Sequence, residues 1–128
     1  MAILGPLFQR IVDLQKTIPA VRKRKKPETI QKNTLKKLLW KAQNTSFGKQ
    51  YDFSDLYFST DPVKAFQKSV PLFDYNKIYD AWWYRTLQGE QDVCWPGKTK
   101  YFALSSGTSE AASKHIPITA DILRSIKR

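Results

Sequence analysis

The stretch Phe102–Thr119, FALSSGTSEAASKHIPIT, decides the fold class of this 128-residue chain. The flanking runs Lys100–Leu104 and His115–Ile118 contain aromatic and β-branched residues and predict two short strands. Between them lies Ser105–Ser113, a loop of small and polar residues with one glycine. Gly107 allows the backbone to turn and to approach a ligand closely. We therefore expect a strand, a loop and a second strand.

The composition of this loop is suited to anion binding. Its hydroxyl groups and successive backbone N–H groups can form a concavity that accepts phosphate oxygens. Lys114 at the loop exit can add a positive charge. The loop is not a Walker A motif, because Lys114 is preceded by Ser113 rather than glycine and is followed by His115. From the loop residues alone, an ordinary polar turn is the favoured interpretation, and phosphate binding is the alternative.

The rest of the chain predicts helices, because apolar residues recur at spacings of three and four. These helices are expected at residues 3–18, 28–42, 75–87 and 120–127, with a short one beginning at Pro62. Thr60 or Asp61, Asp74 and Thr119 are the predicted N-caps. Residues 19–27 and 46–55 are expected to be loops.

The helix at 28–42 is predicted to have one buried and one solvated side. The expected buried residues are Ile30, Leu35, Leu38, Leu39 and Ala42. The expected solvated residues are Lys32, Lys36, Lys37 and Lys41. On the helix at 75–87, Trp82 and Trp83 are expected to pack in the core rather than to stack on nucleic-acid bases.

Positive charge is concentrated in the first part of the chain. Residues 1–50 hold 12 of the 22 lysines and arginines but only two acids, Asp13 and Glu28, and so account for most of the net charge of +11. Such a segment can be a solvated helical face, which we favour, or can bind nucleic acid or acidic lipid through residues 22–49, including the run Arg22–Lys26.

Cysteine and histidine are too rare for several kinds of site. Cys94 and His115 are the only residues of their types, so no disulfide within the chain, zinc cluster or Ser–His pair is expected. No stretch approaches the ~20 apolar residues of a membrane span, and no signal peptide is apparent. We therefore expect a cytoplasmic protein.

Three segments resemble one known family. The run FALSSGTSEAASKHIPIT is similar to the first nucleotide-binding motif of the Gretchen Hagen family of auxin-responsive acyl-acid amidosynthetases, within the luciferase-like adenylate-forming superfamily, and it shares the spacing from Ser105 to Lys114. The runs TLKKLLWKAQNTSFGKQYDF and VPLFDYNKIYDAWWYRTLQGE resemble two upstream segments of that family. The likeness covers about residues 28–119. It departs at Ala111 and Ser113, where the family pattern has glycine and often proline.

The resemblance implies an α/β fold, namely the helix-rich amino-terminal part of the large domain of an adenylate-forming enzyme with the first strands of its sheet. The chain 1–128 would then be a fragment of one larger domain, helical at 1–90, with strand, phosphate loop and strand at 99–118 and the start of a helix at 120–128. The remainder of the polypeptide would hold the later motifs, so the fragment alone is expected to be inactive.

The resemblance also implies a reaction. ATP, with Mg²⁺, and a small carboxylic acid form an acyl-adenylate, and an amine or amino acid then takes the acyl group. The residues expected to bind the ATP phosphates are Ser105, Ser106, Gly107, Thr108, Ser109 and Lys114. Glu110 would position Mg²⁺ or only orient the turn, while no catalytic residue and no protein metal site are predicted. An acyl-CoA ligase, a basic non-catalytic module and a purely structural fragment are the alternatives.

Overall fold

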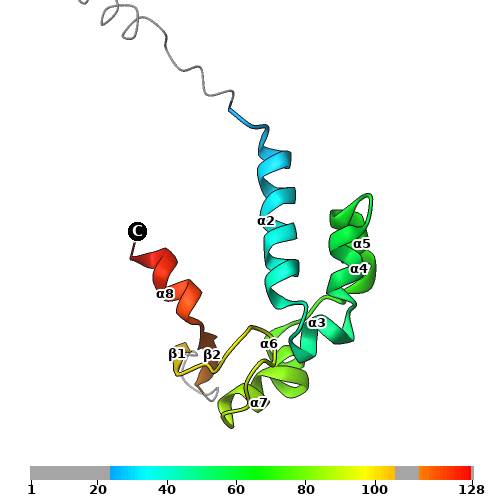
Figure 1. Ribbon diagram of the computed structural model, residues 1–128. Helices are drawn as coiled ribbons and strands as arrows, with labels where there is room; N and C mark the ends of the chain where they lie inside the picture. Colours follow the sequence, from blue (N-terminus) through cyan, green and yellow to red (C-terminus); the bar gives the residue numbers. More distant parts are fainter. Residues whose placement is uncertain (1–23, 106–112, 128) are drawn as a thin grey trace, which may run out of the picture.

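The computed structural model describes residues 24–105 and 113–127 as a set of helices joined to one two-stranded antiparallel sheet (Figure 1). This arrangement confirms the expected helix-rich α/β class. The predicted helix at 3–18 and the middle of the predicted phosphate loop lie outside the described residues. In order, the elements are α2 (Pro27–Ala42), α3 (Ser46–Gln50), α4 (Phe53–Phe58), α5 (Pro62–Ser69), α6 (Tyr75–Ile78), the π-helical turn η1 (Tyr79–Trp83), α7 (Tyr84–Leu87), β1 (Tyr101–Ser105), β2 (Lys114–Ile118) and α8 (Ala120–Ile126).

Helix α2 begins at Pro27, one residue before its predicted start, because proline is tolerated where no helical N–H is needed. Among the elements that the structure describes, only those packed on its second half cover it. Leu39 and Ala42 are buried, at 1% and 2% exposure, as predicted. Ile30 and Leu38 were predicted to be buried, and this is wrong, since they are 52% and 48% exposed.

Two of the predicted solvated lysines of α2 also have specific partners. The ammonium of Lys36 lies 4.6 Å from the centre of the Tyr57 ring. Lys41 forms an ion pair with Asp121 of α8. Lys41 is exposed, as predicted, whereas Lys36 is half-buried. The ion pair of Lys41 adds a partner that the sequence did not indicate.

The segment 46–55, predicted to be a loop, instead contains α3 and the start of α4. The side chain of Thr45 caps α3 by accepting a hydrogen bond from the N–H of Gly48 at 3.0 Å. The N–H groups of Ser46 and Phe47 donate to the carbonyls of Asp92 and Val93, each at 2.8 Å. These partners satisfy helix-terminal donors that a five-residue helix cannot pair internally.

The main apolar core lies where α2 meets α4. Its buried members are Leu39, Ala42, Phe53 and Leu56. Phe47 extends the core with three aromatic neighbours, the rings of Tyr51, Phe53 and Trp82, whose centres are 4.7, 5.7 and 5.1 Å from its own. The core therefore joins α2–α4 to the helical segment that begins at Tyr75.

Residues 75–87 form the predicted third helix, interrupted by the π-helical turn η1. Asp74 caps it as expected, accepting from the N–H of Lys77 at 2.8 Å. Gly89 follows its end with a φ of +92°, a conformation that glycine adopts without strain. Trp82 and Trp83 are both half-buried, which agrees with a packing role.

The remaining elements follow the prediction within one residue. Strands β1 and β2 pair antiparallel, with Ser105 opposite Lys114 and Tyr101 opposite Ile118. The side chain of Thr119 caps α8 by accepting from the N–H of Ile122 at 3.3 Å. In Figure 1 the sheet and α8 lie on one side of α2, and α4 and α5 lie on the other. Within the described ranges, no helix has the length and apolar character needed to cross a membrane.

Candidate functional site

The predicted phosphate loop connects β1 to β2. Of the residues expected to bind phosphate, Ser105 ends β1 and Lys114 begins β2, and these two face each other in the strand register. Ser106, Gly107, Thr108 and Ser109 lie outside the described residues, as does Glu110. The strand pairing therefore brings the first and last predicted residues together at the base of the loop.

Tyr75 of α6 holds the beginning of β2. Its hydroxyl accepts a hydrogen bond from the backbone N–H of His115 at 2.9 Å. Its ring centre lies 5.2 Å from the Nζ atom of Lys114, within the range of a cation–π contact. One side chain thus contacts two successive residues at the loop exit. Periodicity marked Tyr75 only as the first residue of a helix, because its partners lie about 40 positions away in the sequence.

Tyr75 is itself supported by two aromatic rings of the same helical segment. The ring of Tyr79 stacks on it, with centres 5.6 Å apart and planes 24° apart. The ring of Trp83 meets it edge-on, with centres 6.1 Å apart. The spacing of four between residues 75, 79 and 83 is the sequence signal for this row. Of its members, only Trp83 was expected to pack in the core.

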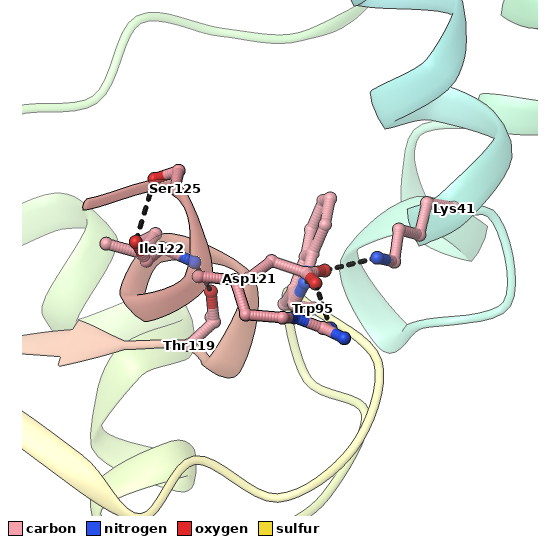
Figure 2. Close-up of polar contacts among 7 residues, drawn as sticks. Lys41, Trp95, Thr119, Asp121, Ile122 and Ser125 are labelled. Carbon is pink, nitrogen blue, oxygen red and sulfur yellow. Dashed lines mark hydrogen bonds and ion pairs between the residues drawn. The ribbon is translucent and has the colours of Figure 1, made fainter. Parts of the chain in front are cut away.

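A polar cluster around Asp121 fixes the helix that follows β2 (Figure 2). One Asp121 oxygen accepts from the indole Nε1–H of Trp95 at 2.9 Å and also pairs with Lys41, while the other pairs with Arg124. The hydrogen bond from Lys41, followed by that from Trp95, lowers the pKa of Asp121 to about 2. The carboxylate therefore stays ionised at neutral pH and links α8 to α2 and to the segment before β1.

A mainly apolar cleft of about 460 Å³ lies between α2, η1, the segment 90–99 and α8. Its walls include Leu38, Trp83, Val93, Trp95 and Ile122. Strand β2 reaches the cleft with Pro117, at the end of the strand opposite Lys114. The cleft and the base of the phosphate loop are thus separate features.

Cys94 and Glu90, two other polar residues considered from the sequence, contact protein groups that give them structural roles. Burial raises the pKa of the Cys94 thiol to about 12, so this thiol is protonated at neutral pH and a poor nucleophile. Glu90 forms a two-pronged ion pair with Arg85, one bond of which is 2.8 Å long. Within residues 24–105 and 113–127, no three acidic, histidine or cysteine side chains converge as a metal site would require.

The comparison with protein families gives one match. The sequence model described as the GH3 family N-terminal domain matches residues 20–128. The matched range includes all of the described helices, both strands and the loop between them. A comparison with curated protein sequences gives no match.

Proposed function

Because the chain belongs to the GH3 family of acyl-acid amidosynthetases, we propose that it supplies the ATP phosphate-binding loop of such an enzyme. The enzyme would activate a carboxylic acid as an acyl-adenylate and then join the acyl group to an amine or amino acid. The observation that carries the proposal is the pairing of Ser105 with Lys114, which closes a hydroxyl-rich loop at its base.

The reaction defines what the loop must do. A carboxylate oxygen attacks the α-phosphorus of ATP, the bond to the bridging oxygen breaks, and pyrophosphate leaves with its electrons. The loop N–H and hydroxyl groups of Ser106–Ser109, together with the ammonium of Lys114, would hold the three phosphates in line and stabilise the growing negative charge. In the second step the amine attacks the acyl carbon and AMP leaves.

Mg²⁺ fits this arrangement as a companion of ATP. Magnesium in nucleotide sites is commonly held by substrate phosphates, waters and one or two carboxylates rather than by a protein cage. Glu110 is the candidate carboxylate within the loop. The metal would neutralise phosphate charge.

Exposed apolar side chains support the further proposal that these residues are part of a larger domain. Leu38 and Trp40 of α2 are 48% and 54% exposed, and Leu104 of β1 is 65% exposed. Apolar surface of this kind is commonly covered by other elements. We propose that the remainder of the polypeptide, which holds the adenine, ribose and acyl sites, packs against this part of the chain.

The test of the loop is pyrophosphate exchange into ATP by the full-length protein, with candidate carboxylic acids. Ser106→Ala and Thr108→Ala should each lower the exchange rate by about 10²-fold, the usual effect of removing one donor to a developing charge. Ser125→Ala is the matched control, since the Ser125 hydroxyl only donates to the carbonyl of Ile122 on α8. Binding of Mg–ATP that does not depend on Ser106 and Thr108 would contradict the proposal.

The acceptor is tested separately. The full-length protein is supplied with ATP, an acid that supports exchange, and either a set of amino acids or coenzyme A. The proposal expects an amide product, identified by its mass. Formation of a thioester instead would assign the enzyme to the acyl-CoA ligases and leave the role of the loop unchanged.

A further inference from the structure

Lys114 makes a cation–π contact at the base of the loop between β1 and β2. Its ammonium lies over the face of the Tyr75 ring, with Nζ 5.2 Å from the ring centre. A ring face attracts the positive charge but takes up none of the three N–H donors of the ammonium. Within residues 24–105 and 113–127, no carboxylate pairs with Lys114, so there its N–H donors are open to an anionic ligand.

Tyr75 also fixes the backbone from which Lys114 extends. Its hydroxyl accepts from the N–H of His115 at 2.9 Å. That N–H points away from β1, so the hydroxyl occupies the outer edge of β2 beside the loop. Tyr75 therefore restrains Lys114 in two ways. Its hydroxyl holds the adjacent backbone at His115, and its ring contacts the Lys114 ammonium.

The Tyr75 ring is held in place by contacts within the protein, with no ligand present. Asp74 caps the helix at Tyr75, and the rings of Tyr79 and Trp83 pack against the tyrosine. A lysine side chain is a flexible four-carbon stem that loses rotamer freedom when it binds a phosphate. A contact that restricts the stem in advance lowers this loss and improves affinity.

We propose that Tyr75 is a positioning residue, which holds the ammonium of Lys114 at the loop exit for the polyphosphate of ATP. This role rests on the proposed function, since it requires that the loop binds ATP. Tyr75 should contribute to specificity as well as to affinity, because the positive charge that it positions should favour binding of a nucleoside triphosphate over a monophosphate.

Three variants of the full-length protein separate the contacts. Tyr75→Leu removes both the ring and the hydroxyl, whereas Tyr75→Phe keeps the ring and loses only the hydrogen bond to His115. Tyr79→Phe is the control on the same helix, since it keeps the ring that stacks on Tyr75. Binding of Mg–ATP and of AMP is measured by calorimetry, and thermal unfolding shows whether each variant is folded.

Tyr75→Leu should weaken Mg–ATP binding by about two- to fivefold, the range of a partly exposed cation–π contact. AMP binding should change less than twofold. Tyr75→Phe should restore most of the ATP affinity, and Tyr79→Phe should match the unaltered protein. In a Lys114→Met background, Tyr75→Leu should have no further effect on ATP binding.

Several results would overturn the role of Tyr75 while leaving ATP binding intact. These are unchanged ATP affinity in Tyr75→Leu, an equal loss for ATP and AMP, or an effect of Tyr75→Leu that persists without Lys114. If Tyr75→Leu does not fold, a Tyr75→Phe protein whose ATP affinity falls as far as that of Lys114→Met also contradicts the role assigned to the ring. No binding of Mg–ATP by the unaltered protein would overturn the proposed function together with this inference.

Discussion

Replacing Gly48 by alanine sets two effects of opposite sign against each other. Gly48 lies inside α3, where alanine is favoured over glycine by about 1 kcal/mol on helix propensity alone. A Cβ at this position, however, would lie 2.0 Å from the carbonyl oxygen of Ala42 and 2.9 Å from its carbonyl carbon. Ordinary contact begins at 3.4 Å, so the backbone would have to move by about 1.4 Å, the difference between these two distances.

The atoms in the way cannot rotate aside, because they belong to the backbone at the end of α2. The Ala42 oxygen accepts from the N–H of Thr45 at 3.0 Å and from its hydroxyl at 2.7 Å. Moving it strains both bonds, each of which contributes about 1 kcal/mol, in addition to about 1–3 kcal/mol for overpacking. After the gain in propensity, we expect Gly48→Ala to lower the free energy of unfolding by about 3 kcal/mol.

Urea unfolding followed by tryptophan fluorescence measures this change. The control is Lys49→Ala, a substitution at the next, exposed residue of α3, which should stay within about 0.5 kcal/mol of the unaltered protein. An alanine at position 48 that leaves the urea midpoint unchanged, or raises it, would refute the close approach of α3 to the end of α2.

Two further predictions concern ionisable groups. The pKa of Asp121 is lowered from 3.8 to about 2 in the folded protein, so its ion pairs stabilise the fold above about pH 4 and are lost as the pH falls through about 2. Asp121→Asn should remove this acid-dependent loss of stability and should lower the free energy of unfolding at pH 7 by up to about 1 kcal/mol. An acid-unfolding curve that is the same in the variant would contradict this role of Asp121. Burial raises the pKa of Cys94 from 9.0 to about 12. The thiol should therefore react with iodoacetamide at pH 8 about 10³-fold more slowly in the folded protein than in urea, because the thiolate is the reactive form. Equal rates would show that the thiol is not protected.

The elements with local signals were predictable from sequence. Asp61, Asp74 and Thr119 each cap the helix that was expected to follow them, because an N-cap acts within three residues of its own position. The two strands were predicted to within one residue, since the loop between them marks both ends. Family membership followed from the same stretch of sequence.

The incorrect predictions depended on contacts between distant parts of the chain. Helix α3 is completed by the carbonyls of Asp92 and Val93, more than 40 residues away, which no local pattern reveals. Ile30 and Leu38 fit an amphipathic stripe, yet the described elements cover only the second half of α2. Lys41 is exposed as predicted, but its ion pair with Asp121 was not predicted, because Asp121 is 80 positions further on.

The same kind of distant contact determines where the phosphate loop is held. At the loop end of β2, Tyr75 contacts Lys114 and His115, and beyond the other end of β2, Trp95 holds Asp121. Both anchoring residues belong to the segment 75–95, which is itself joined to α3 through Asp92 and Val93. The loop sequence can therefore supply the phosphate donors, but the position of its base relative to the helices is set by residues outside it. Mutations in this segment should change nucleotide affinity without removing any loop donor, and Tyr75 is the position where that distinction can be measured.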